Sequence, residues 1–144
     1  MNAEDLNACL RGEIAAIETY EQALDKIRGE YAADARFQQL AAMLQDHQEA
    51  AARLRGLVQQ CGAAPATDSG AWGAWSKTVM GTAKLLGDKA ALKALKEGEE
   101  DGVKQYDRVA QQASALTEVR SAAATLKTKN EEHIRQLDLL IETA

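Results

Sequence analysis

Apolar residues recur along this chain at alternating steps of four and three, the spacing of a helix that buries one side against other helices. A first pair of such runs spans residues 6–27 and 37–58, and a second pair spans residues 92–113 and 119–140. A break rich in turn-forming residues, at 29–34, separates the members of the first pair. The pattern predicts four helices in two antiparallel hairpins.

The segment between the two pairs has a different character. Pro65 and several glycines surround an amphipathic stretch that carries Trp72 and Trp75 on one side, so we expect a loop and a short crossover helix whose tryptophans cover the core. Asp88 is a suitable N-cap for the third long helix. The expected layout is one domain, residues 1–144, with a hairpin at 1–60, a crossover at 61–88 and a hairpin at 89–144.

Composition agrees with an all-α fold. The chain has 144 residues, one proline and 4% aromatic residues, which suits one helical domain with one core. The formal net charge is -5 and the basic residues form no run, which argues against nucleic acid as a partner. No segment approaches the ~18 apolar residues of a membrane span, and no signal-peptide pattern opens the chain. We therefore expect a cytoplasmic protein with no membrane partner.

The two cysteines do not suggest a disulfide framework. In the predicted first hairpin, Cys9 and Cys61 lie at heights that differ by roughly 15 Å at 1.5 Å per residue, beyond the ~7 Å Cα separation that a disulfide can bridge. We expect two free thiols. Cys9, close to the apolar side of its helix, is expected to act as a small buried hydrophobic residue.

The two hairpins repeat each other at a constant offset of 86 residues, without a gap. The offset matches apolar residues with apolar residues along both helices of each hairpin. It also matches three kinds of polar residue, pairing Glu13 with Glu99, His47 with His133, and Tyr20 with Tyr106. The chain therefore reads as a duplicated hairpin.

Turn positions place the glutamates and histidines at one height. In an antiparallel hairpin, Glu13 and His47 are level if the turn is centred at residue 30, which lies in the first predicted break. Glu99 and His133 are level if the second turn is centred at residue 116, and the second break is predicted at 114–117. The sequence thus predicts a single inward-facing layer with one Glu and one His from each hairpin.

Such a layer needs a compensating partner, because a buried, unpaired charge is costly. Two carboxylates and two imidazoles from four helices supply the oxygen and nitrogen ligands that suit iron, manganese or zinc. Alternatively, the histidines hydrogen-bond the glutamates and tyrosines in a metal-free polar layer that fixes the register of the helices. The residues leave both interpretations open.

The first helix resembles the bacterioferritins and rubrerythrins through Leu6-Asn7, Glu13 and Tyr20. Nearly the whole chain is similar to a bacterial family of uncharacterised ferritin-like bundle proteins, through Arg11-Gly12-Glu13, residues 69–73, and the stretch from Glu97 to Tyr106. This resemblance implies a ferritin-like four-helix bundle. It also implies a role for each residue of the layer: Glu13 and Glu99 as carboxylate ligands, His47 and His133 as imidazole ligands, Tyr20 and Tyr106 as hydrogen-bond donors beside them.

The chain departs from that superfamily at the position three residues before each histidine. The superfamily has a glutamate there that bridges two metals, whereas this chain has Leu44 and Asn130. Without the bridging carboxylates, one metal fits better than two, with Asn130 beside the ligands. Asp46 and Glu132 directly precede the histidines, about 100° around the helix, so we expect them outside the ligand layer or on the surface.

These observations predict a metal-binding bundle protein, with iron as the first candidate and manganese or zinc next, and with a stress or redox role. The alternative is a metal-free structural or interaction module. A bundle of this size with a long crossover is expected to form a homodimer or a small homo-oligomer. A hydrolase or transferase has little support, because the chain contains no phosphate-binding glycine loop and no nucleophile elbow.

Overall fold

The computed structural model describes residues 3–70, 74–112 and 115–144, with only the backbone described at residues 74 and 75. Within these residues the chain is all-α, as predicted, and contains no strand. Its elements are α1 (Ala3–Tyr31), α2 (Ala35–Gln60), α3 (Ala74–Met80), the 3-10 turn η1 (Leu85–Gly87), α4 (Lys89–Ala110) and α5 (Thr117–Thr143).

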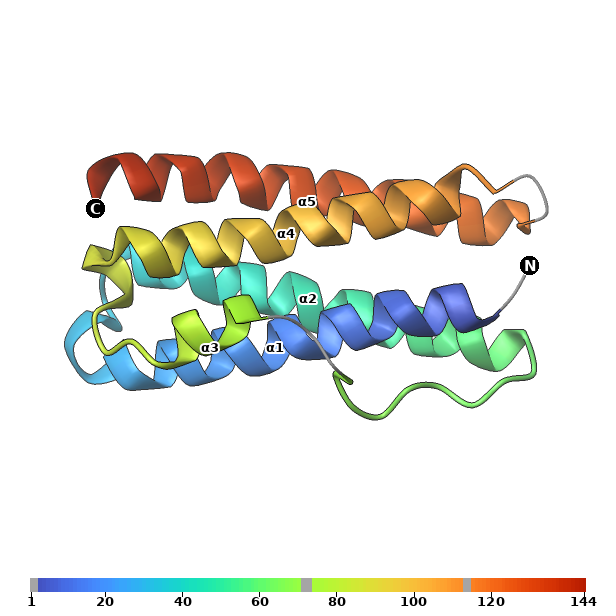
Figure 1. Ribbon diagram of the computed structural model, residues 1–144, viewed down its shortest axis with the longest axis horizontal. Helices are drawn as coiled ribbons and strands as arrows, with labels where there is room; N and C mark the ends of the chain where they lie inside the picture. Colours follow the sequence, from blue (N-terminus) through green and yellow to red (C-terminus); the bar gives the residue numbers. More distant parts are fainter. Residues whose placement is uncertain (1–2, 71–73, 113–114) are drawn as a thin grey trace.

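The long helices pack side by side as a bundle (Figure 1). Helices α1 and α2 contact each other along their length, as do α4 and α5, so each half of the sequence forms its own pair. Further contacts of α1 with α4 and of α2 with α5 join the pairs. Because every long helix touches two others, the middle of the bundle can receive a side chain from each of them.

The first turn begins later than predicted. Helix α1 continues through Gly29 to Tyr31, so the predicted start of the break at residue 29 is wrong by three residues. A side chain at Gly29 would meet open space, and Tyr31 packs against the core, which favours one more helical turn. Asp34 then caps α2 by accepting a hydrogen bond from the backbone N–H of Arg36 at 2.8 Å.

The second hairpin also differs from its predicted bounds. Asp88 caps α4 as expected, accepting from the backbone N–H of Ala91 at 3.1 Å. However, α4 ends at Ala110, before the predicted end of the run at residue 113, and α5 begins at Thr117, which was assigned to the break. Residues 113 and 114 lie outside the described residues.

The crossover contains the predicted short helix, α3, and a 3-10 turn. Helix α3 packs against α1 and α4, and Val79, Leu85 and Leu86 of the crossover are buried. The predicted cover formed by Trp72 and Trp75 lies outside the described residues and side chains. The crossover therefore closes one side of the bundle next to α1 and α4.

The two thiols are free, as predicted. Cys9 is buried and Cys61 is exposed. Burial, with a smaller contribution from nearby Glu13 and Asp5, raises the pKa of the Cys9 thiol to about 12, so this thiol stays protonated and unreactive at neutral pH.

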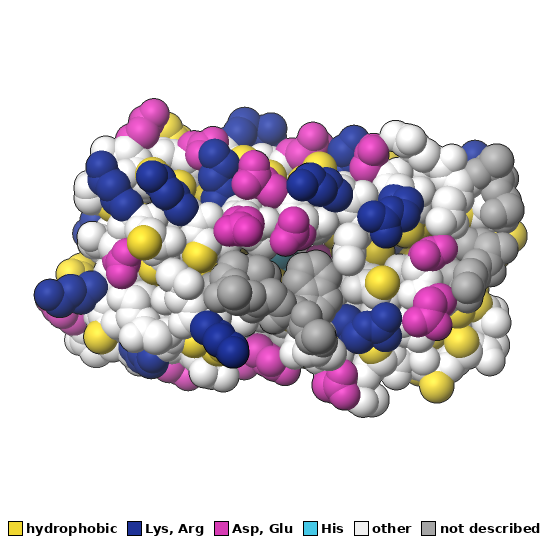
Figure 2. Space-filling view, viewed as in Figure 1, with side chains coloured by type: hydrophobic (Ala, Val, Ile, Leu, Met, Phe, Trp, Pro, Cys, Tyr) yellow, Lys and Arg dark blue, Asp and Glu magenta, His cyan; other side chains and the backbone are white. Residues whose placement is uncertain are grey.

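On the outside, acidic and basic side chains are interspersed over the face shown in Figure 2. None of the helices, over the described residues, has the length and apolar character that crossing a membrane requires.

The interior contains two apolar clusters, one towards each end of the bundle. The first includes Tyr20, Leu40 and Leu92. The second includes Leu54 and Tyr106. A layer of buried polar side chains, formed by Glu13, His47, Glu99 and His133 with Asn130 beside it, lies between the two clusters.

Candidate metal centre

The structure brings the four predicted ligands together in the middle of the bundle. Glu13 lies on α1, His47 on α2, Glu99 on α4 and His133 on α5. None is more than 4% exposed to solvent. The position of each follows from the helical spacing of its apolar neighbours, because a residue on the apolar side of a helix must point where that side points.

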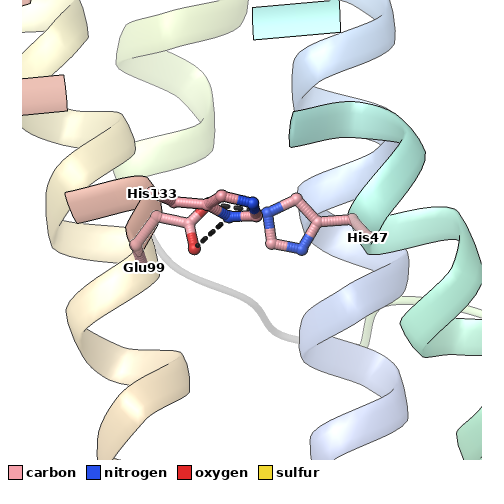
Figure 3. A group of neighbouring side chains, drawn as sticks. All are labelled: His47, Glu99 and His133. Atoms are coloured by element: carbon pink, nitrogen blue, oxygen red, sulfur yellow. Dashed lines mark hydrogen bonds and ion pairs between the residues drawn. The ribbon is translucent and has the colours of Figure 1, made fainter. Parts of the chain in front are cut away.

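Glu99 is the centre of the layer. His47 Nε2 lies 2.6 Å from Glu99 Oε1, and His133 Nδ1 lies 3.2 Å from each Glu99 oxygen. The Tyr20 hydroxyl donates a 2.8 Å hydrogen bond to Glu99 Oε1. Figure 3 shows the two imidazoles and the carboxylate pointing towards one another from α2, α4 and α5.

Glu13 holds the other side of His47. Its Oε2 lies 2.6 Å from His47 Nδ1, and its Oε1 accepts a 2.6 Å hydrogen bond from the Tyr106 hydroxyl. The two tyrosines thus bind the glutamate of the opposite hairpin, Tyr20 on α1 binding Glu99 and Tyr106 on α4 binding Glu13. Both tyrosines are therefore hydrogen-bond donors beside the glutamates, the position that the family resemblance implied for them.

The outer nitrogen of His133 breaks the twofold repeat. Its Nε2 lies 2.8 Å from Asp46 Oδ2, whereas the corresponding nitrogen of His47 contacts Glu99. The Asp46 side chain is 28% exposed and has Lys129 Nζ 3.9 Å from its other oxygen. The sequence placed Asp46 outside the ligand layer without assigning it a partner. In the sequence, the signal for this contact was an acidic residue directly before each histidine.

These contacts form a row in which carboxylates and imidazoles alternate: Glu13, His47, Glu99, His133 and Asp46. Burial by itself lowers the pKa of His47, but the negative charges of Glu99 and Glu13 outweigh it and raise that pKa well above its usual value. The pKa of His133 is raised in the same way, with burial and the charge of His47 opposing Glu99 and Asp46.

Glu99 is affected in the opposite sense. Burial raises the pKa of its carboxyl, but the two imidazoles outweigh burial and lower that pKa to about 2. Burial also raises the pKa of Tyr20 and of Tyr106 well above the usual value, so both phenols stay neutral and can donate. The alternation along the row thus favours the imidazolium forms of His47 and His133 and the ionised form of Glu99.

This row predicts how the stability of the metal-free protein depends on pH. The raised pKa values of His47 and His133 contribute stability that is complete below 6.5, the unfolded value, and is lost as pH rises through their folded values. The lowered pKa of Glu99 contributes stability that is complete above 4.5 and is lost as pH falls towards 2. Urea unfolding in the presence of a chelator is expected to show a maximum between pH 4.5 and 6.5. A free energy of unfolding that rises from pH 6.5 to 9 would contradict this assignment of charges.

Three of these residues are arranged so that they can share one metal ion. One ligand atom from each of His47, Glu99 and His133 lies within 4.8 Å of the others, and all three residues are buried. Glu13 is outside this group, because its two oxygens contact His47 Nδ1 and the Tyr106 hydroxyl. The predicted set of four is therefore divided into three residues that can bind together and one that supports His47.

The outer nitrogen of each histidine is held by a carboxylate. Glu13 lies against His47 Nδ1, and Asp46 lies against His133 Nε2. This leaves His47 Nε2 and His133 Nδ1 facing Glu99. Metal-bound histidines are typically held this way, because a carboxylate behind the ring fixes its orientation and makes its inner nitrogen more basic.

Asn130 lies beside the layer, as expected, and is 4% exposed. It lines a cavity of about 20 Å³ with Gly98 and Gly102 of α4. Leu44, at the equivalent position of the first hairpin, is half-buried and packs against the apolar cluster around Tyr20.

Comparison with known proteins gives a family but no activity. A family model described as a domain of unknown function, DUF2383, matches residues 3–112. The match includes α1, α2, α3 and α4, and so contains Glu13, His47 and Glu99, whereas His133 lies beyond it. No curated protein matches the chain, and no solved structure matches it either.

Proposed function

The chain belongs to the DUF2383 family, whose description names no activity, so we propose a function from the site itself. We propose that the protein is a ferritin-like bundle that binds one divalent metal ion between His47, Glu99 and His133. Iron is the first candidate for this ion. The observation that carries the proposal is the approach of three ligand atoms from three helices to within 4.8 Å in a buried site. Imidazole nitrogen and carboxylate oxygen suit iron, manganese and zinc.

Charge balance supports a single ion. Each of the two imidazoles has carboxylates at both of its nitrogens, and the raised pKa of each favours its doubly protonated form when no metal is bound. A divalent ion that displaces one proton from His47 and one from His133 adds two positive charges, and the two displaced protons remove two. Binding therefore leaves the net charge of the buried layer unchanged and releases protons. A second ion lacks this compensation, because Leu44 and Asn130 supply no further carboxylate.

The ferritin-like part of the proposal rests on the combination of duplication and layer. Each hairpin contributes one Glu and one His from facing helices, and each tyrosine reaches across to the other hairpin. In metal-binding bundles, carboxylates and histidines project inward from four helices in this way. Bound iron would supply one-electron redox chemistry, which is the basis for proposing a stress or redox role.

Metal titration of the chelator-treated protein tests the proposal. Isothermal titration with Fe(II) without oxygen, and with Mn(II) and Zn(II), is expected to give one ion per chain. Repeating the titration in buffers of different ionisation enthalpy is expected to show proton release. Glu13→Gln is expected to weaken binding by about 10–100-fold, because it removes the carboxylate that holds His47. The matched control is Glu21→Gln, an exposed carboxylate on the same helix. Absence of binding, or equal affinities for the two variants, would count against the proposal.

A second candidate is a metal-free module in which the layer fixes the register of the helices. The observation that favours it is that both nitrogens of His47 and of His133 already face carboxylates. A fully hydrogen-bonded buried network is stable without a metal and disfavours other alignments of the helices. The titration separates the two candidates, because a purely structural layer gives no saturable metal binding.

A further inference from the structure

A small cavity lies next to the candidate metal centre, on the side of α1 and α4. His47 and Glu99 line it together with Asn130, Gly98 and Gly102. Its volume is about 20 Å³, compared with the roughly 10–15 Å³ that one water molecule requires. In Figure 2 a small part of a histidine side chain is visible near the middle of the face, beside acidic side chains.

Asn130 is unusual among the buried polar residues. Its side chain is 4% exposed, and over the described part of the chain its amide has no hydrogen-bond partner, unlike the four charged residues of the layer. An unpaired buried amide is unfavourable, and such groups in folded proteins call for a ligand, a water or a functional reason. The amide offers both a donor and an acceptor to whatever occupies the cavity.

Gly102 provides the room for this amide. A Cβ atom at Gly102 would clash with Asn130 Nδ2, so any side chain there would displace the amide. Glycine inside a helix is less favourable than alanine, and the equivalent position of the first hairpin is Ala16. That hairpin has Leu44 in place of Asn130. The polar cavity is thus built on only one side of the duplicated layer. The two residues that build it, Asn130 and Gly102, are each unfavourable for the stability of the fold.

We propose that this cavity is the site of an exchangeable ligand of the metal: a water molecule that a diatomic molecule such as nitric oxide can replace, with the Asn130 amide donating a hydrogen bond to the bound diatomic molecule. The inference rests on the proposed function, since His47, Glu99 and His133 would supply three ligands and leave a position open on the ion. The size of the cavity limits the ligand to one or two heavy atoms. Such an exchange would release the water and would need no external oxidant, reductant or proton.

The test uses the full chain loaded with Fe(II) without oxygen and titrated with nitric oxide, with electron paramagnetic resonance as the readout of the adduct. Asn130→Leu removes the amide with little change in shape and is expected to weaken nitric oxide binding about tenfold, the effect of losing one hydrogen bond. Gly102→Ala is expected to do the same by displacing the amide. The matched control is Gln136→Leu, because Gln136 lies three residues after His133 and Asn130 lies three residues before it. This variant is expected to bind nitric oxide like the wild type.

Two further readings separate this inference from a structural role and from failure of the metal site. The melting temperature of metal-free Asn130→Leu is expected to equal or exceed that of the wild type, because an unpaired amide is removed; a clear decrease would indicate a structural role and overturn the inference. Iron content is measured in every sample. Wild-type protein that retains no iron overturns both proposals, whereas retained iron with no adduct, or with equal affinities in wild type and Asn130→Leu, overturns only this one.

Discussion

Replacing Glu99 with Gln is expected to abolish metal binding and to destabilise the metal-free protein. Glu99 contacts both histidines and Tyr20, so its charge supports every inner contact of the layer. Metal affinity is expected to fall by more than about 100-fold, beyond the ~10–100-fold typical of a residue that only supports a ligand. Without metal, leaving the buried imidazolium ions without their shared carboxylate is expected to lower the free energy of unfolding by about 3–5 kcal/mol.

The neighbouring residue provides a matched control. Glu100 carries the same side chain one position further along α4 and is exposed. Glu100→Gln is expected to keep wild-type metal affinity and to change the free energy of unfolding by less than about 0.5 kcal/mol. Denaturant unfolding with a chelator, together with metal titration, measures both effects. Glu99→Gln protein that binds metal as the wild type does would remove Glu99 from the site.

Replacing both histidines with Leu has the second largest expected effect. In His47→Leu/His133→Leu, Glu13, Glu99 and Asp46 lose the positive charges between them. At pH 7 the double variant is expected to lose about 3–5 kcal/mol of stability, because buried carboxylates remain without a cation. Lowering the pH to 5 is expected to recover part of this loss, since unpaired buried carboxyls have raised pKa values and take up protons.

Melting curves at the two pH values measure this effect. The control is Gln48→Leu/Arg135→Leu, which introduces two leucines at exposed positions near the same two histidines. Its melting temperature is expected to stay close to that of the wild type at both pH values. If the histidine double variant is as stable as the wild type at pH 7, the imidazoles do not neutralise the buried carboxylates.

Much of the fold could be predicted from the sequence because helical periodicity is a local signal. The apolar spacing located the four long helices, the 86-residue repeat paired Glu13 with Glu99 and His47 with His133, and the predicted turn positions placed these four residues at one height. The ends of the helices were predicted less well. Helix α1 extends to Tyr31 because that side chain packs against the core, and no local pattern reports such a tertiary contact.

The partners of individual atoms could not be predicted, because the repeat in the sequence is more regular than the contacts. Asp46 reaches His133 on α5, a helix distant in sequence, and Glu132 makes no equivalent contact with His47, whose two nitrogens face Glu13 and Glu99. This choice depends on side-chain rotamers in the packed bundle. It decides which nitrogen of each ring faces inward, and therefore which atoms can bind a metal.

The environment of the layer also depends on the whole fold. Apolar clusters around Leu40 and Leu54 cover it on both sides, and its four charged residues are almost fully excluded from bulk solvent, at most 4% exposed. Electrostatic interactions are stronger in such surroundings than at the surface. The same exclusion that raises the cost of an unpaired charge therefore increases the benefit of a bound cation.

Anomalous diffraction from crystals of protein purified without chelator and supplied with Fe(II) tests the central claim most directly. Data collected on both sides of the iron absorption edge are expected to show one peak per chain, within bonding distance of His47 Nε2, Glu99 and His133 Nδ1, with Glu13 and Asp46 still in contact with the outer nitrogens. No peak at this position, with His47 and His133 still hydrogen-bonded to Glu99 as in the metal-free layer, would contradict it.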